Sequence, residues 1–340
     1  MPAFASTITT TVLVVVVYFW VVRLIDMNEK EPLWAMALLF ALGSGAAVVL
    51  PWLAPADVLA LSVVPAAALK ELARFLAIGA GIYAITVYGR IRGWQEFNGT
   101  MDGIVYGACA GLGFAVATEL RAELIFGAVP LPGASVGLLA GFVRIALFGM
   151  ADGVLGALIG AGIGASTDAR SPVARALFPV AAVAAAVAAH VGFVTLAHGD
   201  ALGGTAGLVR SYAAMALPVI ALAIVIIVAL RAERAAIRRQ LPAEADTGVV
   251  TPDDLALLLD GVARTKAYWQ ELVRGRLTRW ANLRELHNRQ VQLALIKDKA
   301  ARLALPSSPP DLDRDVERLR HNVLECKRRL ATGPSKKGEA

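Results

Sequence analysis

Three ionisable residues that could support hydrolysis lie inside long apolar segments: Glu71, Asp152 and His190. Two carboxylates and an imidazole at similar membrane depth could hold a divalent metal, or a water molecule with its general base. The same groups could instead form a neutralised ion cluster that holds helices in register. A charge at bilayer depth costs about 3 kcal/mol or more, so such groups usually pair inside a bundle. The residue types alone leave both interpretations open.

Other ionisable residues accompany these three. Lys70 and Arg74 are i,i+4 neighbours on one face of the expected helix, and Glu71 reaches Arg74 at i,i+3. The general behaviour of intramembrane charges favours a structural role for the two cations. Glu119 lies near the non-cytoplasmic end of another apolar segment, at 101–121.

The composition is that of a membrane protein. The 340-residue chain is 57% hydrophobic and only 18% charged, with a mean hydropathy of +0.62. Long apolar runs fill residues 8 to about 230, whereas the remainder is polar with helical periodicity. We therefore expect an all-α fold, in which a polytopic membrane helix bundle is followed by a cytoplasmic helical hairpin or short coiled coil.

The apolar runs predict seven spans, and eight if residues 57–88 form two segments instead of one. That run is longer than a single crossing needs, so it must tilt, kink at Pro65 or break near its charges. The expected spans are 6–25, 33–53, 57–88, 101–121, 136–164, 174–197 and 211–230. Basic residues follow the last span closely, which predicts a cell-membrane protein with a cytoplasmic C-terminus.

The C-terminal part should be a separate unit. We expect a bundle over 1–231, a linker over 232–250 that is flexible from residue 240, a cytoplasmic helical region over 251–331 and a disordered tail over 332–340. Thr251-Pro252-Asp253-Asp254 is typical of a helix N-cap with a capping box. Residues 231–340 hold 22 basic and 15 acidic residues, a net of +7, whereas the first 230 have a net of −1. This excess indicates attraction to anionic membrane lipids, and no recognised nucleic-acid-binding module is present.

Two glycine ladders predict close helix approach. Their members recur every four residues, the small-xxx-small pattern of membrane helix pairs. They are Gly103, Gly107 and Gly111, and Gly156, Gly160 and Gly164.

Several motifs resemble those of the PrsW-type intramembrane proteases, which are related by motif to the CAAX prenyl endopeptidases. They are Glu29-Lys30-Glu31-Pro32, Met101-Asp102-Gly103-Ile104-Val105-Tyr106-Gly107 leading into Gly111-Leu112-Gly113-Phe114-Ala115, Arg144 before a glycine ladder, and His190. The resemblance implies a peptidase that cleaves membrane proteins within or near the bilayer, with a divalent metal such as zinc. It implies metal ligands at Glu71, Asp152 and His190, and catalytic roles for these and Glu119. Lys70, Arg74, Arg144 and Asp102 would support them.

The catalytic signature departs from that family at three places. The family's Glu-Glu-x-x-Lys element reads Lys70-Glu71-Leu72-Ala73-Arg74, and its Glu-Asn pair reads Thr118-Glu119. The position of a further family histidine is Asp152. The family's glutamate at position 70 is a candidate to activate water, and the lysine found here cannot accept a proton unless its side chain is neutral. The family's glutamate and histidine are replaced by Lys70 and Asp152, so the acidic and the basic residue have exchanged positions. We therefore predict a buried ion pair between Lys70 and Asp152.

These observations leave two main hypotheses for function. One is an intramembrane peptidase with an altered site, in which Glu71 is the surviving base or ligand. The other is a catalytically inactive relative that acts as a membrane scaffold or regulator through its cytoplasmic helices. A small-solute carrier is a weaker third hypothesis, since the two halves of the chain show no clear internal repeat.

Overall fold

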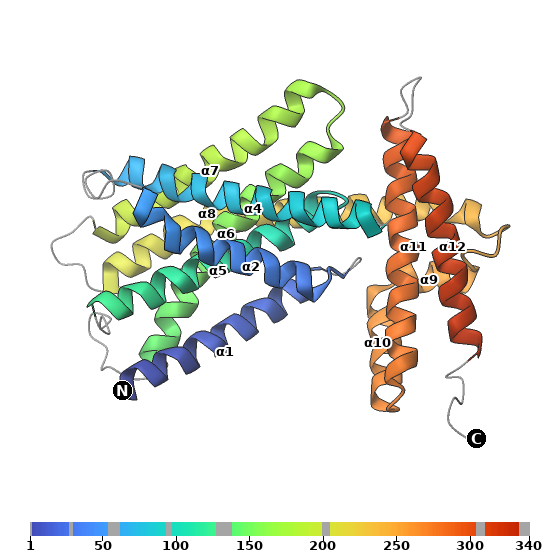
Figure 1. The fold of residues 1–340 in the computed structure, drawn as a ribbon, viewed down its shortest axis with the longest axis horizontal. Coiled ribbons are helices and arrows are strands. Elements are labelled where there is room, and N and C mark those ends of the chain that lie inside the picture. The colour runs from blue at the N-terminus through green and yellow to red at the C-terminus, as the bar shows by residue number, and fades with distance from the viewer. Residues whose placement is uncertain are drawn as a thin grey trace. The chain divides into compact units, whose positions relative to one another are not determined.

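The computed structural model describes residues 2–26, 30–53, 62–92, 97–126, 138–198, 205–303 and 310–332. Within these ranges every regular element is helical, which confirms the all-α prediction (Figure 1). The elements are α1 (Pro2–Ile25), α2 (Leu33–Leu53), α4 (Val63–Arg92), α5 (Thr100–Phe126), α6 (Leu138–Asp168), α7 (Pro172–His198), α8 (Thr205–Gln240), the 3-10 helix η1 (Pro242–Glu244), α9 (Pro252–Leu259), α10 (Gly261–Val273), α11 (Leu277–Leu303) and α12 (Pro310–Thr332).

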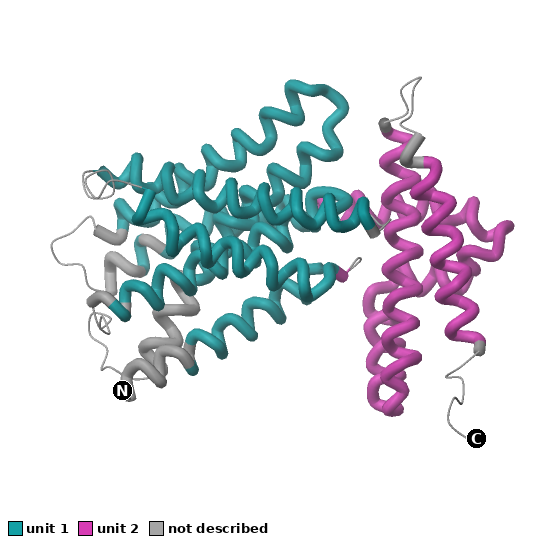
Figure 2. Tube along the Cα trace, viewed as in Figure 1, with its two compact units in different colours: residues 1–26, 31–227 teal, residues 27–30, 228–340 magenta. Residues whose placement is uncertain are grey.

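The helices form two compact units, shown in Figure 2. The bundle unit comprises Met1–Asp26 and Glu31–Ile227, and the tail unit comprises Met27–Lys30 and Val228–Ala340. The border falls inside α8, which continues through it as one helix. It therefore lies close to the boundary that the sequence predicts at residue 231.

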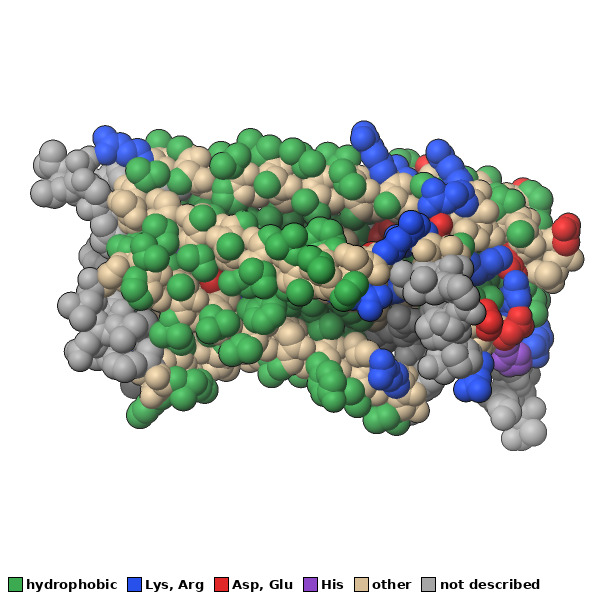
Figure 3. All heavy atoms as spheres, turned by 90° about the horizontal axis from the view of Figure 1, so that it is seen from above, with side chains coloured by type: hydrophobic (Ala, Val, Ile, Leu, Met, Phe, Trp, Pro, Cys, Tyr) green, Lys and Arg blue, Asp and Glu red, His purple; other side chains and the backbone are tan. Residues whose placement is uncertain are grey.

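Among the described residues, six helices are long and apolar enough to cross a membrane. They contain the segments Leu33–Leu53, Val63–Ile91, Thr100–Ala122, Gly149–Asp168, Pro172–Leu196 and Tyr212–Glu244. A shorter apolar stretch, Thr11–Ile25, lies on α1. In the face shown in Figure 3, hydrophobic side chains dominate the surface of the bundle unit, as expected of helices that face lipid. The chain is thus a multi-span membrane protein, while seven or eight spans remains a prediction.

The structure describes residues 62–88 of the long segment predicted at 57–88. Residues 63–92 form the single helix α4, with no break at the charged residues 70–74. Pro65 lies in the first turn, where a proline costs no intrahelical hydrogen bond. At 30 residues, α4 is about 45 Å long. It exceeds the roughly 30 Å hydrocarbon thickness and can tilt or extend beyond it.

The two glycine ladders face each other along α5 and α6, as the sequence predicts. A β-carbon on Gly107 would overlap the carbonyl oxygen of Gly156, and one on Gly156 would overlap that of Gly107. Gly103 and Gly160 form an equally close reciprocal pair. The backbones of α5 and α6 therefore touch, which leaves room for no side chain between them. Gly111, the next glycine of the α5 ladder, packs in the same way against the backbone of Asp152, which is a candidate site residue.

The tail unit has its own apolar core, and residues of the predicted flexible linker belong to it. Leu241, Val249 and Val250 are buried against side chains of α11 and α12. In the segment predicted as a linker, the first residues continue α8, and the later ones bring apolar side chains into this core. Residues 333–340 of the predicted disordered tail lie outside the described residues.

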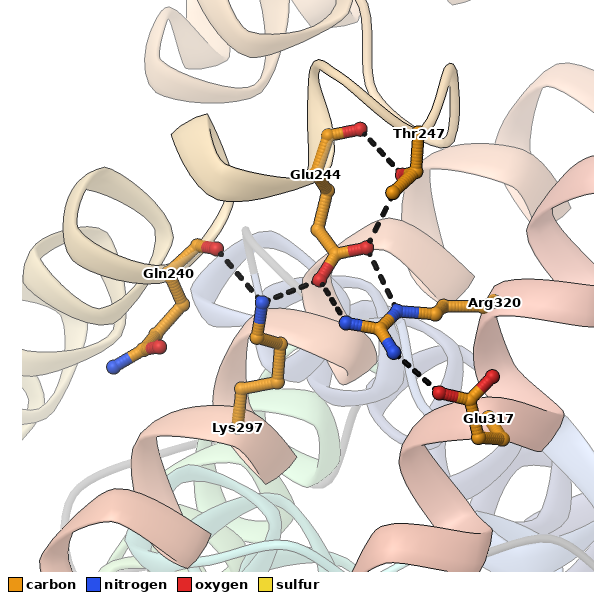
Figure 4. Close-up of polar contacts among 6 residues, drawn as sticks. All are labelled: Gln240, Glu244, Thr247, Lys297, Glu317 and Arg320. Atoms are coloured by element: carbon orange, nitrogen blue, oxygen red, sulfur yellow. Dashed lines mark hydrogen bonds and ion pairs between the residues drawn. The ribbon is translucent and has the colours of Figure 1, made fainter.

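A buried carboxylate, that of Glu244, also joins the segment after α8 to the rest of the tail unit (Figure 4). Glu244 on η1 is fully buried and forms an ion pair with Lys297 of α11. Arg320 of α12 donates to both of its carboxylate oxygens, from Nη2 at 2.7 Å and Nε at 2.9 Å. This fork-to-fork contact is the geometry in which arginine binds carboxylates most strongly. Glu244 therefore links η1 to both long helices of the tail unit.

The predicted capping box is present at the start of α9. Thr251 Oγ1 accepts a hydrogen bond from the backbone N–H of Asp254 at 3.1 Å, and the Asp254 carboxylate accepts one from the backbone N–H of Thr251 at 2.9 Å. Lys327 of α12 also pairs with Asp254 at 2.8 Å. These interactions lower the pKa of the Asp254 carboxyl group, against the opposing effect of burial.

Acid is expected to destabilise the tail unit through His287. This α11 side chain is 1% exposed, and Tyr268 Oη of α10 lies 2.8 Å from its Nδ1. Burial, with a smaller effect of Arg264, lowers the pKa of His287 from 6.5 to about 4. Unfolded chains therefore bind the proton first as the pH falls, and the free energy of unfolding should drop by about 3 kcal/mol between pH 6.5 and 4.

Hydrogen exchange of the α10 and α11 amides measures this effect in the full-length protein. Wild type and His287→Gln should be compared at the same pH, because the intrinsic exchange rate itself varies with pH. Protection in the wild type should fall relative to the variant as the pH is lowered from 7 to 4. A constant difference between the two proteins would mean that His287 does not titrate during unfolding.

Candidate functional site

The candidate site is a chain of buried ionic contacts in the bundle unit. His190 Nδ1 lies 2.5 Å from Glu71 Oε1. Arg74 donates from Nη1 to the same Glu71 oxygen and from Nη2 to Asp152 Oδ1. Glu71 and Arg74 are 0% and 1% exposed, and the Asp152 side chain is 21% exposed. The order of contacts is therefore His190, Glu71, Arg74, Asp152, and we call these four residues the ion cluster.

Three helices supply the members of the ion cluster, and a fourth lines it. Glu71 and Arg74 are one turn apart on α4, whereas Asp152 comes from α6 and His190 from α7. On α5, Phe114 places its ring 4.5 Å beneath the Arg74 guanidinium, within reach of a cation–π interaction. The sequence prediction that Glu71, Asp152 and His190 come together in the bundle is confirmed.

The electrostatics of the ion cluster are nearly balanced. Two carboxylates and one guanidinium leave a charge of −1, which a protonated His190 would cancel. The 2.5 Å approach between a carboxylate oxygen and Nδ1 requires a proton between them. A paired cluster of this kind avoids the cost of isolated charges at membrane depth.

The predicted ion pair between Lys70 and Asp152 was wrong. Arg74 is the partner of Asp152, and among the described residues no ion pair joins Lys70 to it. Lys70 is only half-buried, one turn away from Arg74 on α4. The physical reason is the planar guanidinium, whose fork can donate to two carboxylates at once, whereas an ammonium group is a point charge that favours hydration.

Two other predicted site residues, Asp102 and Glu119, lie on α5. Asp102 is buried at the start of α5, where its carboxylate accepts a hydrogen bond from the backbone N–H of Asn98 at 2.5 Å. This contact holds the residues that precede α5 against the first turn of the helix. Glu119 is half-buried toward the other end of α5. Arg144 lies on α6, in a stretch whose side chains are outside the described ones.

A second group of buried polar residues links two motifs that the sequence analysis noted but did not connect. Tyr106 donates its hydroxyl hydrogen to the carboxylate of Glu31, and both side chains are buried. The backbone N–H of Glu31 donates to Asp26 at 2.8 Å, and Arg23 forms an ion pair with Asp26 at 3.8 Å. The sequence contained both residues in its two most distinctive motifs, Glu31 in 29–32 and Tyr106 in 101–107. It did not indicate that these two side chains are in contact.

Comparison with known proteins identifies the scaffold. Residues 31–230 match the model of the PrsW family, described as intramembrane metalloproteases. The chain belongs to the PrsW family. The match covers more than half of the sequence and nearly all of the bundle unit, including the whole ion cluster. Searches of curated proteins and of solved structures find no match.

The ion cluster of this PrsW-family protein does not fit a divalent metal as arranged. Carboxylates and an imidazole are suitable ligand types for zinc. However, Arg74 lies between Glu71 and Asp152 and donates to an oxygen of each, so a cation already links the two acidic ligands. Among the described residues, no group of three His, Cys, Asp or Glu side chains is placed to hold a metal ion. A metal at Glu71, Asp152 and His190 would have to displace a buried guanidinium.

Proposed function

We propose that this PrsW-family protein binds a membrane-protein partner without hydrolysing it, as a scaffold or regulator. The observation that carries this proposal is the double contact of Arg74 with Glu71 and Asp152. Hydrolysis needs a carboxylate that is available to a water molecule or a metal. In this chain Arg74 holds one oxygen of each carboxylate, and Glu71 itself is fully buried.

The retained scaffold supports a binding function. Family membership implies a bundle suited to membrane-protein substrates. The chain matches the family over residues 31–230, although the catalytic signature implied by the resemblance is changed at Lys70, Glu119 and Asp152. The tail unit would supply a second, cytoplasmic contact surface. Its orientation follows from the basic residues Arg231, Arg234, Arg238 and Arg239, which come directly after the last apolar run. The partners proposed are therefore membrane lipids and a membrane protein.

Intramembrane proteolysis is the second candidate, and one observation favours it. Glu71 Oε2 is buried and has no hydrogen-bond partner in the described part of the chain, while Oε1 contacts His190. A carboxylate with one uncommitted oxygen beside an imidazole has the components of a general base. If a water molecule reached Oε2, Glu71 could accept its proton and His190 could stabilise the charge.

Cleavage in cells distinguishes the two candidates. Membrane-protein fragments should be compared in cells that produce wild type, Glu71→Gln or His190→Gln at equal amounts of folded protein. Glutamine at 190 keeps a hydrogen-bond donor toward Glu71 but cannot act as a base. We expect identical fragments in all three strains. Fragments that appear only with the wild type would overturn the binding proposal and establish the peptidase.

A further inference from the structure

Apolar side chains of the tail unit form an exposed stripe along α10. Val262 is 80% exposed, Trp269 60% and Val273 82%, and Leu277 at the start of α11 is 62% exposed. Spacings of seven and four residues place the three α10 side chains on one helix face. We call these four residues the Trp269 face.

A basic cluster lies at the C-terminal end of α10, where Arg274 and Arg276 are sequence neighbours of Val273 and Leu277. The side chains of Arg274, Arg276 and Arg279 are all more than half exposed. All three approach one carboxylate, that of Glu271, at 3.7, 3.9 and 3.6 Å. Three guanidinium groups that share one carboxylate leave a local charge of +2. These distances are long for ion pairs, so the arginines retain hydrogen-bond donors for another anionic group.

We propose that the Trp269 face and its arginines bind the surface of an anionic phospholipid bilayer. Tryptophan and aliphatic side chains on one helix face, with arginines elsewhere on the same segment, are the composition of interfacial helices that lie in the headgroup region. The apolar side chains would enter the boundary of the acyl chains, and the guanidinium groups would contact lipid phosphates.

The connectivity of the chain strengthens this assignment. α8 carries the most apolar candidate span and continues as one helix to Gln240, only 21 residues before α10 begins. The tail unit is therefore attached through α8 to a span in the bilayer. This attachment keeps the effective concentration of the tail near the lipid surface high. A weak interfacial affinity is then sufficient for occupancy. A second copy of the chain is a poorer occupant, because pairing two such faces would bring like charges together.

The test uses the full-length protein reconstituted into lipid vesicles. Val273→Cys should be labelled with a membrane-impermeant, polarity-sensitive fluorophore, in vesicles of phosphatidylcholine alone or with phosphatidylglycerol, and with a quencher on the lipid acyl chains. Glu317→Cys provides the matched control, since the Glu317 side chain on α12 is 71% exposed. The wild type measures background labelling, because its cysteines, Cys109 and Cys326, are both buried.

We expect a blue shift and quenching at position 273 in the anionic vesicles, and neither at position 317. Replacing Arg276 or Arg279 by Gln should lower the ratio of membrane-bound to free tail by roughly fivefold each, because a basic residue near an anionic surface contributes about 1 kcal/mol. Absence of quenching at 273, or equal quenching in neutral vesicles, would overturn the proposal. A blue shift that grows with protein density but without lipid quenching would indicate a second copy instead.

Discussion

Replacement of Arg74 by methionine is expected to destabilise the bundle unit by about 3–5 kcal/mol, the usual cost of removing one partner from a buried ion pair. The guanidinium is 1% exposed and is the only cation in the described ion cluster apart from a protonated His190. Its loss would leave Glu71 and Asp152 without the cation that contacts both of them. Methionine is long and apolar, so the effect should come from the uncompensated carboxylates and much less from a cavity.

Two variants isolate the electrostatic part of that loss. Leu72→Met on the same helix changes a side chain that is 46% exposed and should be nearly neutral. Adding Glu71→Gln and Asp152→Asn to Arg74→Met removes the charges that the arginine compensated, and should restore much of the stability. Unfolding in mixed micelles with increasing SDS measures each difference. If Arg74→Met unfolds at the same detergent fraction as the wild type, the ion cluster does not stabilise the fold.

Alanine at Gly156 should separate α5 from α6 and cost about 3 kcal/mol, the upper end of the usual range for overpacking. The new methyl group would overlap the carbonyl oxygen of Gly107, which is backbone and cannot move away as a side chain can. The next ladder step, at Gly111, contacts Asp152, so the disturbance should reach the ion cluster. Both the bundle and its buried charges depend on this close approach.

Gly153→Ala is the matched control on the same helix. No atom lies within 4 Å of the position that its β-carbon would occupy. Alanine stabilises a helix interior relative to glycine by up to about 1 kcal/mol, so this variant should be as stable as the wild type or slightly more so. The SDS midpoints of the two variants give the comparison. Equal midpoints would show that the two backbones do not pack as closely as described.

The sequence could predict most of the elements that surround the site. Apolar length indicates the helices, glycine spacing indicates the α5–α6 contact, and Thr251 with Asp254 indicates where α9 begins, because each of these signals is local. It could also predict Glu71, Asp152 and His190 as site residues, since a charge within an apolar run must find a partner. This prediction needs no knowledge of which helices are neighbours.

The partners within the site could not be predicted in the same way. Lys70 and Arg74 are both i,i+4-related cations on α4, and the sequence offered no reason to choose Arg74 for Asp152. The choice depends on the rotation and height of α4 relative to α6. The contact between Glu71 and His190 joins residues 119 positions apart, and no local pattern carries that information. Comparison with the family's signature suggested Lys70 as the partner of Asp152. Such a comparison aligns sequence positions and carries no information on how far each side chain reaches.

By itself, the sequence determined that this protein is a helical membrane protein of PrsW type with a basic helical tail, and which polar residues enter the membrane. The tertiary structure decided that Arg74 joins both carboxylates, that the presumed linker belongs to the tail core, and that Trp269 faces outward. The physical reason is that periodicity reveals which side of a helix is apolar. It does not reveal whether that side meets protein or lipid, or which distant group comes within bonding distance.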